Sequence, residues 1–197
     1  MVGTQKILNY LFISKVRIKC LKYFFFNEDK PIHLRAVARE LGEEINAVRR
    51  ELMRLVEIKL LKSEKRGNKK YFVLNKNFPY FEEFSSVIIK SDGIAEQIIQ
   101  NQSKLGNIQF VGLTSSYISG VKFSHKEIDL IIVGDVELES ISEMVEKEEN
   151  RLQREINYTV LRLSEFNLRK KRRDPFIINL LLSTRVLVIG DREEYNA

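Results

Sequence analysis

Two short helical patterns joined at a glycine, and followed by two short strands, constrain the fold of this chain more than any other feature. The first pattern covers residues 33–41, and Gly42 follows it, at the place where the end of a helix needs a positive φ. The second pattern covers residues 45–58, with apolar residues at the i, i+3, i+7 spacing of one buried face. Residues 60–63 and 71–74 are predicted as the strands of a hairpin around a Gly-Asn turn.

A further helix is predicted before this pattern. Ser14 can cap it, apolar residues as far as Phe25 give it inward faces, and the polar stretch 27–31 ends in a proline that stops a helix. After the hairpin, helices over about residues 80–90 and 93–104 lead into the second half. We place the domain boundary near residue 91, which divides the chain into domains 1–90 and 91–197.

The second half alternates between strands and helices. Strands are predicted at residues 108–113, 128–133, 156–163 and 185–189, and helices at about 137–154, 164–171 and 175–182. We therefore expect an α+β protein, in which a small α/β domain with a mixed sheet follows the helical N-terminal domain.

The charge of the chain is unevenly distributed. The net charge is +6 and the pI about 9.3. Residues 1–90 hold 19 Lys and Arg against 10 Asp and Glu, whereas residues 91–197 hold 14 against 17. The excess positive charge therefore belongs to the first domain, which indicates a polyanionic partner such as a nucleic acid for that domain.

The second helix of the pair has an outward face that suits a DNA groove. On this helix, the residues expected to face DNA are Asn46, Ala47, Arg49, Arg50 and Arg54. At the hairpin tip they are Lys65, Arg66, Asn68, Lys69 and Lys70. A major groove admits one helix, arginine can pair with guanine or hold a phosphate, and a cationic hairpin can reach a minor groove. The alternative is that these cations form only a solvated helix face and an ordinary turn.

The first domain resembles the winged helix-turn-helix domains of small bacterial and archaeal transcriptional regulators of the arsenical-resistance-repressor type. The resemblance covers about residues 5–80 and rests on residues 14–17, 33–42, 48–52, 60–63 and 66–71. It implies binding to double-stranded DNA and transcription regulation. Because one recognition helix and one hairpin bury little DNA surface, we also expect a homodimer. A metal-sensing variant would need paired Cys or His ligands, and this chain has one Cys and two His, which does not support metal sensing.

The second domain resembles the minimal nucleotidyltransferase domain of the polymerase-beta type over about residues 93–190. Ser115-Ser116 stands where that family has a Gly-Ser turn, and Glu127-Ile128-Asp129 stands in place of Asp-x-Asp. The resemblance implies that Ser115 and Ser116 bind a nucleotide, that Glu127 and Asp129 hold metal, and that Ser116, Glu127 and Asp129 are catalytic. The family's chemistry uses Mg²⁺ and a nucleoside triphosphate.

This chain departs from the transferase pattern at several positions. A Cβ at Ser115 replaces a glycine beside the phosphates, and Glu127 is one methylene longer than the usual Asp. The strand that should carry a third acid has none, although Glu155 comes just before it. We therefore expect a catalytically degenerate domain and no cofactor, with Mg²⁺ and a nucleoside triphosphate required only if the site is active. The alternatives are a Mg²⁺-dependent nucleotidyltransferase that modifies a protein, a small molecule or RNA, and an antitoxin-like protein that binds a partner.

The remaining features point to a cytoplasmic protein. The one cysteine, Cys20, rules out an internal disulfide and is expected to be a buried small apolar residue. No apolar run approaches the roughly 20 residues that cross a bilayer, and the first residues carry no signal-peptide pattern. We interpret His33 as a capping or packing residue, and the basic run 169–173 as a solvated helix end.

Overall fold

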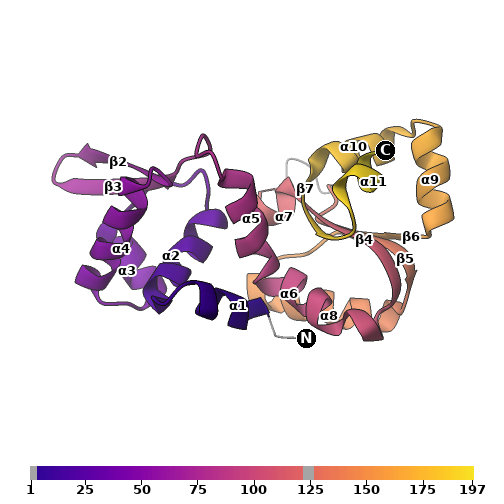
Figure 1. Cartoon of the computed structure of the whole chain (residues 1–197), viewed down its shortest axis with the longest axis horizontal. Coiled ribbons are helices and arrows are strands. Elements are labelled where there is room, and N and C mark those ends of the chain that lie inside the picture. Colours follow the sequence, from indigo (N-terminus) through magenta and orange to yellow (C-terminus); the bar gives the residue numbers. More distant parts are fainter. Residues whose placement is uncertain (1–3, 122–126) are drawn as a thin grey trace. The chain divides into compact units, whose positions relative to one another are not determined.

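The structure is a computed structural model that describes residues 4–121 and 127–197. It divides into two compact units, Thr4–Ile89 and Lys90–Ala197, each with its own sheet and helices (Figure 1). The division falls one residue before the predicted domain boundary. Within the described ranges, no helix combines the length and the apolar character needed to span a membrane.

The first unit has the element order of a winged helix-turn-helix. Its elements are α1 (Thr4–Leu11), α2 (Lys15–Phe25), β1 (Ile32–His33), α3 (Leu34–Leu41), α4 (Ile45–Glu57), β2 (Leu61–Arg66), β3 (Lys69–Leu74) and α5 (Phe81–Lys90), the last of which crosses the dividing line. The three strands form an antiparallel sheet in the order β1-β3-β2. The predicted hairpin is therefore widened by β1, a strand of two residues that no periodicity in the sequence indicated.

Side chains and one glycine set the ends of the short helices. Ser14 Oγ accepts a hydrogen bond from the backbone N–H of Arg17 at the start of α2. His33 Nδ1 accepts one from the N–H of Ala36 at the start of α3, which confirms the capping interpretation. Gly42 ends α3 with φ 62°, a left-handed conformation that glycine adopts without strain. These local interactions define the tight turn between α3 and α4.

The core of the first unit packs the three helices against the sheet. Phe24, Val48, Leu52 and Phe72 are all at most 1% exposed. Cys20 belongs to the same core, and burial, with the carboxylates of Glu51 and Glu43, raises the pKa of its thiol to about 12. It therefore behaves as a small apolar residue, as the sequence predicted.

The second unit contains a four-stranded mixed sheet, as expected. Its elements are α6 (Gly93–Asn101), a 3₁₀ turn η1 (Gln102–Lys104), β4 (Gly106–Thr114), α7 (Ser115–Ser119), β5 (Leu130–Val136), α8 (Leu138–Leu152), β6 (Tyr158–Leu161), α9 (Leu163–Lys171), α10 (Pro175–Ser183), β7 (Thr184–Ile189) and α11 (Arg192–Asn196). The strand order is β6-β5-β4-β7, in which β5 and β6 are parallel and the other pairs antiparallel.

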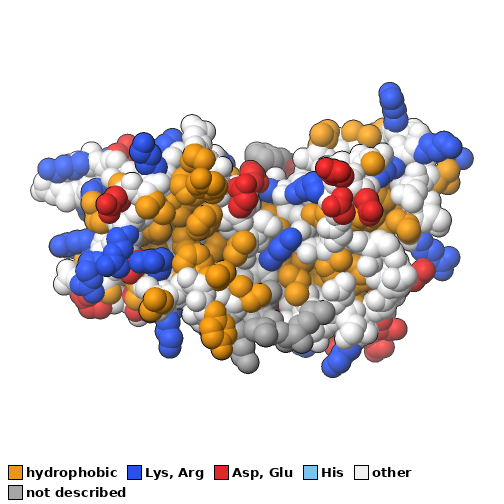
Figure 2. All heavy atoms as spheres, in the orientation of Figure 1, with side chains coloured by type: hydrophobic (Ala, Val, Ile, Leu, Met, Phe, Trp, Pro, Cys, Tyr) orange, Lys and Arg blue, Asp and Glu red, His pale blue; other side chains and the backbone are white. Residues whose placement is uncertain are grey.

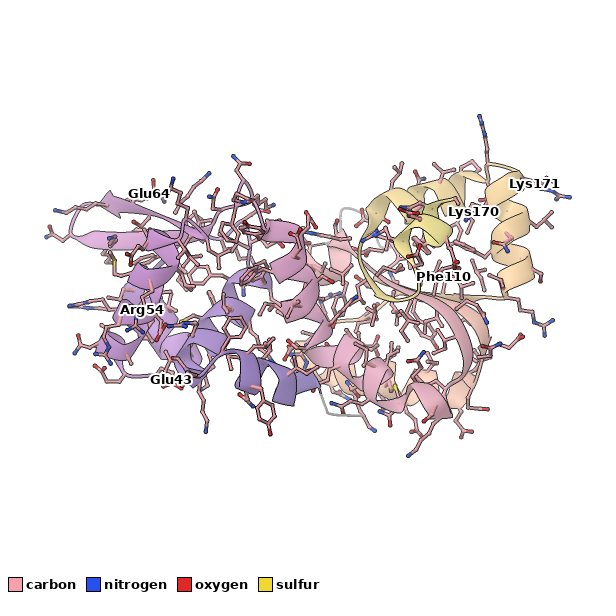
Figure 3. The ribbon with its side chains drawn as sticks, in the orientation of Figure 1. Glu43, Arg54, Glu64, Phe110, Lys170 and Lys171 are labelled. Atoms are coloured by element: carbon pink, nitrogen blue, oxygen red, sulfur yellow. The ribbon has the colours of Figure 1, made fainter. Side chains whose placement is uncertain are left out.

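Three aromatic rings fill the core of the second unit beside the sheet. Phe110 of β4, labelled in Figure 3, lies 5.8 Å from the ring centre of Phe166 and 5.5 Å from that of Tyr195. Gly190 makes this packing possible, because a Cβ there would lie 2.4 Å from Phe110 Cδ1. Tyr195 is carried by α11, a helix of five residues that the sequence analysis did not predict.

Candidate nucleic-acid interface and transferase-like site

The start of α4 is fixed by a carboxylate. Glu44 accepts hydrogen bonds from the backbone N–H groups of Asn46 and Ala47, each at 2.8 Å. These two bonds lower the pKa of Glu44. The cap occupies two N–H groups of the first turn, so the start of the helix presents its side chains rather than these groups to the surroundings.

Four of the five residues predicted on α4 are exposed. They are Asn46, Arg49, Arg50 and Arg54, whereas Ala47 is half-buried. Val48, Leu52 and Leu55 occupy the opposite face and are buried in the core. Figure 2 shows Lys and Arg side chains on the surface formed by α3, α4 and the hairpin. The exposed face thus offers planar hydrogen-bonding groups of the kind that read base edges.

Arg54 occupies the flank of α4 and has an ion-pair partner (Figure 3). Its Nη1 lies 3.0 Å from Oε1 of Glu51, and Arg17 Nε of α2 donates to Oε2 of the same carboxylate at 2.8 Å. Burial opposes the ionisation of Glu51, but hydrogen bonds from Arg17 and Ser14 outweigh it and lower its pKa. Sequence reasoning missed this role of Glu51, which ties α4 to α2.

The hairpin tip carries the other predicted residues in exposed positions. Lys65, Arg66, Asn68, Lys69 and Lys70 are all exposed, and Arg66 pairs with Lys69 in the register on either side of the turn. Gly67 takes φ 57°, which the two-residue turn requires.

Because successive side chains of a strand point to opposite faces, the cations lie on both faces of the hairpin. Lys65 and Lys70 oppose each other on one face, and Lys70 Nζ there lies 3.2 Å from Met53 Sδ of α4. Arg66 belongs to the other face, where it forms an ion pair with Glu64 and lies 5.1 Å from the ring centre of Tyr71.

A groove of about 570 Å³ separates α4 from the hairpin. Arg35, Arg49, Lys69 and Lys70 contribute cations to its walls, and Met53 and Phe72 contribute apolar surface. The predicted helix face and hairpin therefore border one cationic groove. This arrangement can hold phosphates on the groove walls while the outward face of α4 lies on base edges.

The predicted nucleotide-binding serines lie at the junction of β4 and α7. The hydroxyl of Ser116 lies 2.8 Å from Thr114 Oγ1 and 3.1 Å from the carbonyl oxygen of Ile128. Thr114 Oγ1 also donates to the Ile128 carbonyl at 2.7 Å. Ser115 is exposed, and its hydroxyl lies 3.5 Å from the Ser183 carbonyl. The Ser116 hydroxyl thus binds the chain that precedes β5.

The two predicted metal ligands have different environments. Asp129 is fully buried, and its carboxylate accepts a hydrogen bond from the Asn157 N–H at 2.9 Å and lies 3.4 Å from Arg154 Nη1. Glu127 instead lines a cavity between α7 and α10, whose lining does not include Asp129. Both residues precede β5, which begins at Leu130.

The described residues do not fit a site for two Mg²⁺ ions. No three His, Cys, Asp or Glu side chains gather in metal-binding positions within residues 4–121 and 127–197. Asp129 is already charge-paired with Arg154, whereas a bound divalent ion needs several carboxylate oxygens directed at one point. The side-chain partners of Asp129 include the Arg154 guanidinium and the Asn157 backbone N–H.

A buried network that sequence reasoning missed lies on the other side of α7. Tyr117 OH donates to Glu148 Oε1 at 2.6 Å, and Arg151 holds both oxygens of that carboxylate and reaches Asp92 at 3.3 Å. Burial, with the neighbouring Glu148 carboxylate, raises the pKa of Tyr117. A Cβ at Gly93 would lie 2.5 Å from Glu148 Oε1, so the network also requires a glycine there. It fastens α6, α7 and α8 together.

The basic run 169–173 ends α9 and is partly used by the fold. Arg169 pairs with Glu165 one turn earlier at 2.6 Å, and Lys170 Nζ donates to the carbonyl oxygens of Glu194 and Tyr195 (Figure 3). Lys171, like the two residues after it, is exposed. The run therefore combines a solvated helix end with one lysine that holds the C-terminal helix.

Comparisons with known proteins add little to this geometry. No family model matches the chain, and no curated protein matches it. A transcriptional regulator, Tm0710 from Thermotoga maritima, is similar to 52% of this chain and 68% of its own, with 19% identity and a TM-score of 0.38. Human N-acetylserotonin methyltransferase, solved in complex with SAM, is similar over 50% of this chain and 29% of its own, with 17% identity and a TM-score of 0.29. Both TM-scores are low, so neither likeness shows a function for this chain.

Proposed function

We propose that this chain is a DNA-binding regulator of transcription. The observation that carries the proposal is the cationic groove, in which exposed Arg49 of α4 and Lys69 and Lys70 of the hairpin surround one concave surface. Double-stranded DNA presents a phosphate backbone to such cations and base edges to a helix in the major groove.

Different residues serve affinity and specificity in this proposal. Asn46, Arg49 and Arg50 read base edges, because they are exposed on one face of a helix that is rigidly packed on its other side. The cations of the hairpin neutralise phosphates or enter a minor groove. Arg54 supports α4 through its ion pair with Glu51, and it adds a positive charge at the flank of that helix.

The functional form is proposed to be a cytoplasmic homodimer. One recognition helix and one hairpin bury little DNA surface, and a two-fold dimer doubles that surface while imposing a spacing between half-sites. The operator is therefore expected to contain an inverted repeat.

Selection of bound duplexes from a random DNA pool tests the proposal directly. The wild-type chain should enrich a palindromic sequence, and Arg50→Ala should lose enrichment at defined positions while still retaining DNA. Lys104→Ala is the matched control, because it removes one exposed cation from the second unit and should leave the enriched sequence unchanged. Recovery of no common sequence from the wild-type pool would falsify sequence-specific regulation.

We propose further that the second unit is a transferase-like domain without two-metal catalysis. The environment of Asp129 supports this, because its carboxylate is buried and paired with Arg154. Incubation with labelled nucleoside triphosphates and Mg²⁺, using protein, RNA and small-molecule acceptors, should give no transfer that depends on Asp129. Transfer that disappears in Asp129→Asn, in protein that is still folded, would instead establish the enzyme.

A further inference from the structure

The outward face of α4 carries an apolar side chain that the predicted DNA-contacting residues do not include. Met53 follows Arg49 by four positions and Arg50 by three, the spacings at which side chains share one face of a helix. It lines the groove between α4 and the hairpin and is 41% exposed, whereas Phe72, which lines the same groove, is buried. A methionine is therefore open to the surroundings in the middle of a cationic surface.

The fold itself uses only part of this side chain. The core-facing side of α4 is filled by Leu52 and Leu55, which are both buried. Met53 Sδ accepts a hydrogen bond from Lys70 Nζ at 3.2 Å, and a thioether sulfur is a weak acceptor. The same ammonium group lies 5.8 Å from the ring centre of Phe72. These contacts hold Lys70 beside the apolar surface but leave much of the methionine uncovered.

The groove combines positive charge with this apolar surface. Arg35, Arg49, Lys69 and Lys70 supply cations to its walls, so an anionic partner suits it. Phosphates would pair with these cations but would gain nothing from a methionine, because apolar surface is stabilised by contact with other apolar atoms. The groove therefore favours a polyanion that also presents an apolar group.

Duplex DNA presents such a group in its major groove. The 5-methyl group of thymine projects there, and apolar side chains recognise it by contact. An RNA duplex has uracil, which lacks the methyl group, and its narrow major groove cannot be read by side chains. The chemistry of the groove thus favours DNA over RNA, and thymine over the other bases at one position.

We propose that Met53 is a specificity-determining residue that contacts a thymine methyl group in the major groove. The inference rests on the proposed function, because it requires α4 to lie in that groove. Met53 lies one turn after Arg49, about 6 Å along the axis of the helix, and base pairs are spaced about 3.4 Å apart. The thymine should therefore lie within about two base pairs of the pair that Arg49 reads.

Replacement of thymine by deoxyuridine in the selected operator tests this contact, because it removes the methyl group and keeps the base pairing. Each thymine of a half-site is replaced in turn, together with its symmetry mate, and the affinity of the full chain is measured by fluorescence anisotropy. At one position the replacement should weaken wild-type binding about fourfold per half-site, the effect of uncovering one methyl group. An RNA duplex of the same sequence should bind more weakly than the DNA.

Two variants of Met53 and one control separate methyl recognition from packing. Met53→Ala should bind the thymine and deoxyuridine operators equally, whereas Met53→Leu, which keeps an apolar side chain, should retain most of the discrimination. Ile58→Ala removes another exposed apolar side chain, just after α4 and outside the groove, and should retain all of it. A purely structural role of Met53 would weaken binding to both operators by the same factor. Circular dichroism checks that every variant is folded.

Three results would overturn the inference. They are an operator in which no replacement of thymine by deoxyuridine weakens binding, discrimination that persists undiminished in folded Met53→Ala, and an RNA duplex that binds as tightly as the DNA. Each of them can occur while the wild-type chain still enriches one DNA sequence, so the proposed function would survive. Recovery of no common sequence would contradict the proposed function and this inference together.

Discussion

The salt dependence of DNA binding is the sharpest test of the cationic hairpin. Lys65 and Lys69 point to opposite faces of the hairpin, and neither has an ion pair among the described residues, unlike Arg66. Both can therefore bind phosphates without breaking an existing interaction. The double variant Lys65→Ala/Lys69→Ala removes these two charges and leaves the buried core unchanged.

The magnitude follows from counterion release. Each phosphate neutralised on B-form DNA contributes a slope of about −0.9 to the plot of log K against log salt. Loss of two contacts should make the slope less negative by about 1.8 per protomer. If the salt-dependent part of the DNA-binding free energy vanishes near 1 M salt, the affinity of the double variant at 0.1 M salt should be about 60-fold lower per protomer than that of the wild type.

Fluorescence anisotropy with a labelled duplex across a series of salt concentrations measures both quantities. The control Lys30→Ala/Lys104→Ala removes the same net charge at exposed positions outside the groove. Two results would refute the reasoning. One is an unchanged slope in the hairpin variant, and the other is an equal change in the control, which would mean that only the total charge matters.

Three further changes test the site and the fold. Arg49→Ala should cost about 1–3 kcal/mol of discrimination between the selected operator and a mismatched duplex, because a bidentate base contact is lost. Glu51→Gln should lower the free energy of unfolding in urea by about 1.5–3 kcal/mol, since Arg17 and Arg54 lose a charged partner. Because the pKa of Glu51 is lowered in the folded protein, the stabilisation by its carboxylate is complete above the unfolded pKa. This stabilisation is lost as the pH falls through the pKa of the folded state. The free energy of unfolding of the variant should therefore decrease less steeply at acid pH. Tyr117→Phe should destabilise the second unit by about 1–3 kcal/mol, because the Glu148 carboxylate loses a buried donor.

Each of these predictions has a result that contradicts it. Equal weakening on operator and mismatched DNA would make Arg49 a phosphate contact. If the free energy of unfolding of Glu51→Gln decreases as steeply at acid pH as that of the wild type, the pH dependence belongs to other carboxylates. An unchanged urea midpoint in Tyr117→Phe would show that Arg151 alone satisfies Glu148.

Local sequence patterns were sufficient to predict much of the first unit. The ends of α3 and α4 lie within one residue of the predicted ranges, because Gly42 and the apolar periodicity act over a few residues. The exposure of Arg49 and Arg50 follows from the same periodicity. The elements that were missed include β1 and α11, because two and five residues are too few to show a period and each depends on distant partners.

The roles of the acidic residues required the tertiary structure. Glu51 lies in the middle of α4, but its structural role depends on its hydrogen bond from Arg17, which is 34 residues away along the chain. The spacing of Glu127 and Asp129 suggested a shared metal site, but both precede the strand, and Asp129 is buried beside Arg154. Such pairings are decided by packing between elements.

The sequence by itself determined the helix-turn-helix order, the cationic hairpin and the uneven charge, since periodicity, turn chemistry and composition are properties of neighbouring residues. Only the tertiary structure decided that the hairpin and α4 border one groove, and that Glu127 and Asn179, 52 positions apart in the numbering, line one cavity. The physical reason is that burial and charge pairing depend on distances in space, which are set when the sheet and helices pack.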